Sequence, residues 1–169
     1  MIKRIIITGG PCSGKTSIID SLKDKGYKCF TEISREIIQK MNIKTSYKNI
    51  DFEETVFKKR KRDFLNAKIG VNFYDRSMLD NLAYLKINNH EIPIKFKIDC
   101  ENYRYHPKVF ITTPWQDIYT FDDERLESFK ESIRIFEALK QVYKEANYKL
   151  IELPQSSVKE RISFIINEI

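Results

Sequence analysis

The segment GGPCSGKT, Gly9 to Thr16, carries residue types that can bind an anion. It matches the spacing Gly-x4-Gly-Lys-Thr and lies between an apolar run and a helical pattern, the context that a phosphate-binding loop requires. Glycines let the backbone curl until several N–H groups point inward and form an anion nest at the positive end of a helix. Lys15 would reach the β- and γ-phosphates of a nucleotide, and the Thr16 hydroxyl would ligate Mg²⁺.

The loop therefore predicts a nucleotide site. The residues expected to line this site are Gly9, Gly10, Pro11, Cys12, Ser13, Gly14, Lys15, Thr16 and Ser17. Cys12 fills a permissive loop position, with a regulatory thiol beside the phosphates as the alternative. The loop alone does not distinguish a kinase from a plain NTPase or a nucleotide-gated switch. Because no Asn-Lys-x-Asp segment selects guanine, we take adenine as the default base and ATP with Mg²⁺ as the expected cofactors.

A second group of candidates is Asp75 and Arg76, at the end of the run VNFYDRS. A carboxylate at the end of a neighbouring strand faces the phosphate loop, where it can hold Mg²⁺ through water or accept a proton from a substrate. We favour this function, because Arg76 adjoins the carboxylate and strand ends face the ligand crevice. The alternative for Asp75 is a helix N-cap for the segment that starts at Ser77.

Glu32 and Arg35 form a third group in TEISREII. At a spacing of three residues both side chains can lie on one face of a helical turn and offer an acid and a cation to a second substrate. The alternative is that Glu32 only complements the helix dipole.

The segment TTPWQDIYTFDDERLESF, Thr112 to Phe129, is rich in polar and aromatic residues. It could close over the phosphates and bring in Arg125 as a cation that offsets developing charge. The alternative is a surface loop in which Asp122 and Asp123 cap the next helix and Arg125 pairs with one of them.

The elements that must position these residues alternate along the chain. The apolar pattern predicts strands over Ile2 to Thr8, Tyr27 to Thr31, Val71 to Tyr74, Lys108 to Thr112 and Lys149 to Leu153. Helices are expected between them, including a long charged helix over Asp51 to Ile69, a helix from Leu126 and a closing helix from Val158. This alternation predicts an α/β fold whose parallel sheet is covered on both faces, with ligands beyond the carboxyl ends of the strands.

Composition limits the classes of protein. At 169 residues, with 32% charged and 41% hydrophobic residues, the chain is expected to be one soluble globular domain. No apolar run reaches the ~18 residues of a membrane helix, and the first strand leaves no room for a signal peptide. The three cysteines form no CxxC pair, which argues against a disulfide framework and a structural zinc site. We expect a cytoplasmic protein.

The net charge of +6 favours anionic ligands such as nucleotides but does not establish nucleic-acid binding. Its densest run is KKRKR, Lys58 to Arg62, which we interpret as a solvated helix face. A contact patch for RNA, acidic lipid headgroups or a protein partner is the alternative.

Together these segments resemble the NadR-like P-loop ATPase/kinase family, an AAA-type ATPase-like group that includes ribosylnicotinamide kinase domains. The resemblance covers nearly the whole chain, through GGPCSGKT, EISREII, YDRSMLDNLAY, the run from Pro114 to Arg125, and ELPQSSVKERISFI. It implies a three-layer P-loop NTPase fold of the nucleoside/nucleotide-kinase kind, with five parallel strands in the order 2-3-1-4-5.

The resemblance also implies roles for residues. Lys15 and Thr16 would handle phosphates and Mg²⁺, Arg125 would be the lid arginine, and the loop from Pro154 to Ser157 would flank the adenine. The residues that would face the acceptor pocket are Glu32, Arg35, Asp75 and Arg76, with Asp80 as a further candidate.

Two main functions follow. The first is a kinase that moves the γ-phosphoryl of ATP to a nucleoside- or nucleotide-like acceptor, using carboxylate–arginine pairs that simple hydrolysis does not require. The second is a nucleotide-dependent binding module with slow NTPase activity and no small-molecule acceptor. An RNA-associated protein is a third and less favoured interpretation.

Overall fold

The computed structural model describes residues 1–31, 33–34, 37, 50–119 and 128–169. One parallel five-stranded sheet has the order β2-β3-β1-β4-β5, which confirms the predicted fold class. The strands are β1 (Ile2–Gly9), β2 (Lys28–Phe30), β3 (Gly70–Asp75), β4 (Lys108–Thr112) and β5 (Lys149–Leu153). The helices are α1 (Lys15–Asp24), α3 (Ile50–Leu65), α4 (Met78–Ile87), α5 (Ile94–Asn102), η2 (Gln116–Ile118), α6 (Phe129–Glu145) and α7 (Val158–Glu168).

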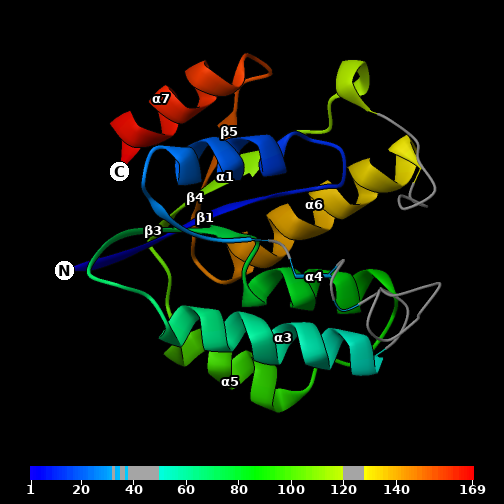
Figure 1. Ribbon diagram of the computed structural model, residues 1–169. Helices are drawn as coiled ribbons and strands as arrows, with labels where there is room; N and C mark the ends of the chain where they lie inside the picture. Colours follow the sequence, from blue (N-terminus) through cyan, green and yellow to red (C-terminus); the bar gives the residue numbers. More distant parts are fainter. Residues whose placement is uncertain (32, 35–36, 38–49, 120–127) are drawn as a thin grey trace.

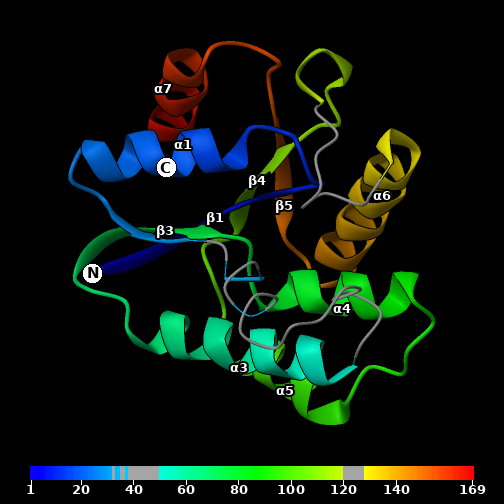
Figure 2. The same cartoon turned by 45° about the vertical axis from the view of Figure 1, so that its right-hand side comes forward.

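Helices cover both faces of the sheet (Figure 1). The apolar run of β1 explains this, because successive side chains of a strand point to opposite faces. Ile5 and Ile7 pack in the cluster formed with α1 and α7, whereas Ile6 packs in the larger cluster with α4 and α6. Figure 2 shows α3 and α5 on the same side as α4, beyond the sheet. β1 is thus buried on both faces in the middle of three layers.

Two element boundaries differ from the sequence prediction. The charged helix α3 ends at Leu65, four residues before the predicted Ile69. The side chain of Asn72 accepts a hydrogen bond from the Lys68 N–H and donates to the carbonyl oxygens of Lys68 and Gly70, so it organises a turn into β3. The polar composition of this segment does not distinguish a turn from a helix end.

The helix α5 was missed, because the segment before Tyr105 has no clear periodicity. The ring of Phe96 in this helix stacks on the ring of Phe57 of α3, with ring centroids 3.7 Å apart. This contact attaches α5 to the core. A helix was also expected after the second strand, with Ile33, Ile37, Ile38 and Met41 on its apolar face, and it falls largely outside the described residues. Among the described helices, none has the length and apolar character needed to cross a bilayer.

The basic run on α3 is not a continuous cationic surface. Lys58 pairs with Glu54, Lys59 with Asp63 and Lys61 with Asp99, all through ion pairs. Arg60 is buried and donates a hydrogen bond to Asn81 on α4. The run therefore combines solvated ion pairs with one side chain that serves the interior.

Candidate functional site

The loop between β1 and α1 has the backbone conformation of an anion nest. Gly9 has φ 142°, Gly14 has φ 79° and Cys12 has φ 52°. Positive φ values of this kind are costly for residues other than glycine, so they mark a loop whose shape is held by its surroundings. The loop ends at the N-terminus of α1, where backbone N–H groups and the helix dipole favour an anion.

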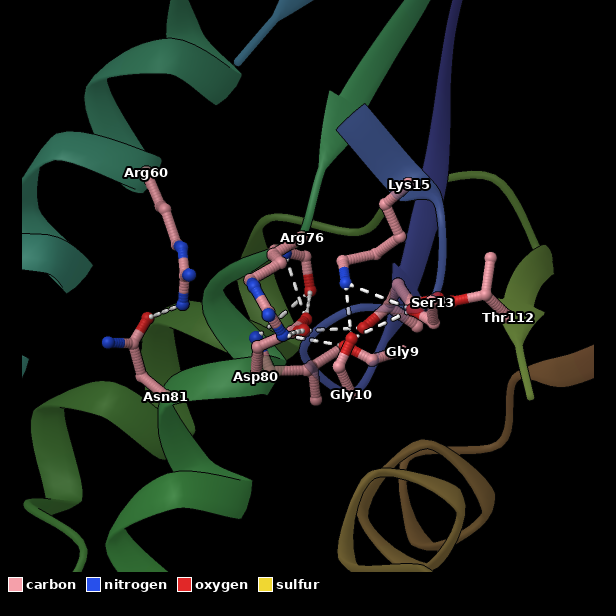
Figure 3. Close-up of polar contacts among 12 residues, drawn as sticks. Gly9, Gly10, Ser13, Lys15, Arg60, Arg76, Asp80, Asn81 and Thr112 are labelled. Atoms are coloured by element: carbon pink, nitrogen blue, oxygen red, sulfur yellow. Dashed lines mark hydrogen bonds and ion pairs between the residues drawn. The ribbon is translucent and has the colours of Figure 1, made fainter. Parts of the chain in front are cut away.

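Lys15 and Ser13 close the loop from inside, and both are buried. The ammonium group of Lys15 donates to the carbonyl oxygen of Gly10 over 2.5 Å and to Ser13 Oγ over 3.3 Å (Figure 3). Ser13 Oγ also lies 2.6 Å from Thr112 Oγ1, at the end of β4. The lysine is therefore held over the loop, where a phosphate oxygen would offer it a charge-assisted hydrogen bond.

Gly9 and Thr112 are partners in the register between β1 and β4. A Cβ atom on Gly9 would lie 2.0 Å from Thr112 Oγ1 and 2.6 Å from the Thr112 carbonyl oxygen. Only glycine fits this approach, because part of the obstruction is backbone that cannot move aside. Thr112 therefore helps to fix where the loop leaves the sheet.

Asp75 and Arg76 lie beside this loop. Asp75 ends β3 and is the register partner of Ile7, two residues before Gly9. The guanidinium of Arg76 donates to the Gly9 carbonyl oxygen over 2.9 Å, and its backbone N–H donates to the Ile7 carbonyl over 3.0 Å. Arg76 has φ 71°, a conformation that non-glycine residues adopt rarely and that recurs at functional sites.

Asp80 is fully buried and is hydrogen-bonded on both oxygens. Its Oδ1 accepts from Thr8 Oγ1 over 2.5 Å and lies 3.6 Å from Arg76 Nη1. Its Oδ2 accepts from the Ser77 N–H over 2.9 Å and from the Tyr143 hydroxyl over 2.5 Å. The carboxylate thus connects β1, the start of α4 and helix α6.

Ser77 caps α4 in a capping box with Asp80. The N-cap role considered for Asp75 therefore belongs to Ser77, whose Oγ accepts a hydrogen bond from the Leu79 N–H. Asp75 remains at the strand end, outside the helix, with 5% of its surface exposed.

A second buried polar cluster joins α3 to α4. Asn81 accepts a hydrogen bond from Arg60 over 2.7 Å, as Figure 3 shows, and donates to Glu53 Oε2 over 2.6 Å. Burial raises the pKa of Glu53 to about 7, although the charge of Arg60 and the hydrogen bond from Asn81 act in the opposite direction. Sequence reasoning missed this cluster, since Arg60 was counted with its exposed neighbours in the basic run.

The structure offers oxygen ligands suited to Mg²⁺ at the loop. Thr16 is exposed at the first turn of α1. Asp75 ends β3, the strand that pairs with β1. Among the described residues there is no group of three or more His, Cys, Asp and Glu side chains that could hold a metal alone. This donor set fits Mg²⁺, which takes one or two protein ligands and completes its shell with phosphate oxygens and water.

The remaining predicted residues divide into two groups. Pro154 is exposed directly after β5, and Ser17 is exposed on the first turn of α1. Glu32, Arg35 and Arg125 lie outside the described residues, so their predicted roles stay predictions. Thr112 and Thr8 were not considered as candidates. Both lie at or near the carboxyl end of a strand, where parallel sheets bind their ligands.

A family model described as an AAA domain matches residues 4–161 of the sequence. No curated protein matches the sequence. The family match covers the phosphate loop, the Asp75–Arg76 junction and the loop after β5, so all described parts of the site fall within it.

Several solved structures share the fold. A deoxyadenosine kinase from M. mycoides with bound dATP has a TM-score of 0.71 and 18% identity, with 98% of each chain covered. A NadR protein in complex with NR has a TM-score of 0.73 and 16% identity, over 98% of this chain and 49% of that one. A thymidylate kinase from Ehrlichia chaffeensis has a TM-score of 0.62 and 14% identity, with 98% of each chain covered. At these identities the likeness establishes the fold.

Proposed function

Because the chain belongs to the family of P-loop proteins described as AAA domains, matched over residues 4–161, we propose that it is an ATP- and Mg²⁺-dependent kinase for a small nucleoside- or nucleotide-like acceptor. The observation that carries the proposal is the position of Asp75 and Arg76 beside the phosphate loop, with Arg76 hydrogen-bonded to Gly9. A carboxylate and a guanidinium at this place suit phosphoryl transfer to a second substrate. The solved structures of similar fold include kinases of nucleosides and nucleotides, which supports this class of acceptor.

The phosphates of ATP would bind in the loop from Gly9 to Thr16. Backbone N–H groups at the start of α1 would hold phosphate oxygens, and Lys15 would exchange its bond to the Gly10 carbonyl for a stronger bond to a charged oxygen. Adenine is the proposed base, and the exposed turn at Pro154 is proposed to flank it.

Thr16 and Asp75 would hold Mg²⁺, directly or through water. When bound there, Mg²⁺ would supply positive charge that offsets part of the negative charge developing during transfer. Thr16 lies in the first turn of α1 and Asp75 ends β3, so the two ligands would come from a helix N-terminus and a strand end.

The acceptor would bind on the β3 side of the loop. Asp75 or Glu32 would orient the acceptor or take its proton, and Arg76 and Arg35 would offset negative charge. Arg125 would act from the segment between β4 and α6 as a further cation. For Asp80 we propose a positioning role in place of acceptor contact, because its oxygens already bind Thr8, Ser77 and Tyr143 in the interior.

The test is ATP consumption with Mg²⁺, followed by phosphorus NMR and mass spectrometry of the products. The acceptors are deoxyadenosine, deoxycytidine, thymidylate and nicotinamide riboside, each compared with no acceptor. We expect ADP formation that depends on one of them and yields its phosphorylated form. Release of free phosphate at a rate indifferent to all acceptors would contradict the kinase and favour the nucleotide-dependent module.

Two variants distinguish phosphoryl transfer by this protein from the activity of a contaminating enzyme. Lys15→Ala should abolish the reaction, since phosphate binding loses its cation. Asp75→Asn should lower the turnover number by about 100-fold or more, the range of a lost general acid–base group. A turnover number of Asp75→Asn within twofold of the wild type would remove Asp75 from the proposed mechanism.

A further inference from the structure

Three segments, one of them the phosphate loop, meet on the side of the sheet covered by α1 and α7. They are the loop residues Ser13 and Gly14, the connection after β4 at Trp115, and Arg161 on α7. Figures 1 and 2 show η2 and the turn between β5 and α7 on this side of the sheet. The segments are about a hundred and about fifty residues apart in sequence, so only the fold brings them together.

Arg161 lies at the centre of this meeting point. A Cβ atom on Gly14 would lie 2.8 Å from its Nη1 atom, so the guanidinium is packed directly against the loop. The guanidinium carbon is 5.5 Å from the centre of the Trp115 ring. Arg161 therefore contacts the phosphate loop and faces the indole at the same time.

The hydrogen bonding of Arg161 is incomplete. The side chain is 4% exposed, and its Nε is buried with no hydrogen-bond partner among the described residues. Its bond from Nη1 to the Ser13 carbonyl oxygen is long, at 3.4 Å. A buried cation with so few partners within the described part of the chain is costly to the fold, which indicates a role other than stability.

The loop that carries Trp115 is fastened to the next loop. The Gln155 amide donates to Thr113 Oγ1 over 3.2 Å and to the Pro114 carbonyl oxygen over 2.9 Å. This bridge joins the connections after β4 and β5 immediately before the tryptophan. The partly exposed indole of Trp115 is thus positioned by this bridge to the preceding backbone and by the guanidinium of Arg161 over its ring.

We propose that Trp115 is the stacking residue for the heteroaromatic base of the donor nucleotide and that Arg161 is the positioning residue that holds its ring beside the phosphate loop. An indole offers a flat surface on which any base can stack, and the guanidinium fixes the distance between that surface and the loop. The inference rests on the proposed function, because it places the base of the same nucleotide whose phosphates the loop would bind.

The strand order separates this place from the acceptor side. β3 and β4 flank β1 on opposite sides, so Asp75 and Arg76 approach the phosphate loop from one side and Trp115 from the other. A phosphoryl group that moves between two substrates needs a binding place on each side of the loop. Trp115 therefore serves the donor and the Asp75–Arg76 pair serves the acceptor.

The test uses the intrinsic fluorescence of Trp115, which is the chain's single tryptophan. The full chain is titrated with ATP and with inorganic triphosphate in the presence of Mg²⁺, while calorimetry measures both dissociation constants. We expect ATP to change the emission in a saturable way at its calorimetric dissociation constant. Triphosphate should bind without that change, because it has no base.

The variants test the same inference by affinity. Trp115→Ala should weaken ATP binding by about tenfold, the order expected for loss of one stacked base, and leave triphosphate binding within twofold. Trp115→Phe retains an aromatic face and should recover most of the ATP affinity. Arg161→Lys keeps the charge but not the planar group, so it should reduce the ATP-induced change with little effect on triphosphate. Arg134→Ala, at an exposed arginine of α6, is the matched control and should change neither ligand.

The outcomes distinguish failure of the stacking role from failure of the proposed function. If ATP and triphosphate bind the wild type but Trp115→Ala weakens both equally or neither, the stacking role is overturned and the proposed function stands. If ATP changes no emission at saturation, the stacking role is overturned as well. If neither ligand binds the wild type, both the stacking role and the nucleotide-dependent function fail.

Discussion

The guanidinium of Arg76 holds the carbonyl oxygen of Gly9 over 2.9 Å, although the two residues are 67 positions apart. The contact joins the end of β3 to the first residue of the phosphate loop. Because the backbone N–H of Arg76 also bonds to Ile7, the junction after β3 is attached to β1 at two points. The phosphate loop and the residues proposed to meet the acceptor are therefore in direct contact.

Replacement of Arg76 by lysine should lower the turnover number by about 100-fold, similar to the loss of one donor to developing charge. Lysine keeps the charge but cannot hold Gly9 and face the acceptor with the same planar group. Steady-state kinetics measures the effect, with the acceptor that the product analysis proposed above identifies. Arg134→Lys is the control, and an unchanged turnover number for Arg76→Lys would argue against a catalytic role.

Gly9→Ala should destabilise the protein by about 3 kcal/mol or more, because the new Cβ would overlap Thr112 and a positive φ is strained for alanine. Gly26→Ala is the matched control: Gly26 has φ 85°, but nothing lies within 4 Å of a Cβ placed there. Its cost should be about 1 kcal/mol, from backbone strain alone. Urea denaturation measures both, and equal losses would show that the approach of Thr112 is not limiting.

Tyr143→Phe should cost about 1.5 to 3 kcal/mol of unfolding free energy, since it removes a buried donor to the Asp80 carboxylate without creating a large cavity. Tyr27→Phe is the control, because Tyr27 is partly exposed and makes an edge-to-face ring contact with Phe73 that phenylalanine can keep. That change should stay within about 0.5 kcal/mol. Similar denaturation midpoints for the two variants would contradict the central place of Asp80.

Glu53 predicts a pH dependence of stability. Its pKa is raised from 4.5 to about 7, so the folded protein holds this proton more tightly than the unfolded chain does. The contribution of Glu53 to stability is therefore fully present below pH 4.5 and is lost as the pH rises through about 7. At about 1.4 kcal/mol per pH unit, the loss is about 3 kcal/mol.

Glu53→Gln removes this titration and keeps an oxygen that can accept from Asn81. The variant should be more stable than the wild type at pH 8, and the difference should shrink toward pH 5. Denaturation at several pH values measures it. Glu54→Gln, one residue along the same helix, is the control, because Glu54 forms surface ion pairs worth less than about 1 kcal/mol. A constant difference between Glu53→Gln and the wild type across this range would exclude the raised pKa.

The phosphate loop and a parallel sheet could be predicted from local patterns, whereas the order of the strands followed from the resemblance to the NadR-like family. The loop GGPCSGKT, the apolar run of β1 and the alternation of strands with helices are all short-range features, and they identify a parallel sheet whose ligands lie at the strand ends. Asp75 and Arg76 were found by the same rule, because the position of a residue at a strand end is visible in the sequence.

The partners of these residues could not be predicted in this way. Asp80 was a further candidate for the acceptor pocket, and no sequence pattern predicted that its oxygens bond to Thr8, Ser77 and Tyr143. Arg60 was grouped with its charged neighbours. Because successive residues of a helix point in different directions around its axis, Arg60 faces Asn81 while its neighbours in the run are partly or fully exposed. Burial of a polar side chain depends on which element packs above it, and the sequence near that residue does not contain this information.

The sequence by itself therefore determined the phosphate loop, the parallel sheet and the edge of the sheet at which ligands are expected, because these follow from local spacing and strand periodicity. Only the tertiary structure decided that Arg76 bonds to Gly9, that Asp80 bonds to Tyr143 and that Arg161 lies between Trp115 and the loop. These contacts join segments tens of residues apart, and such pairs are selected by packing of the whole chain.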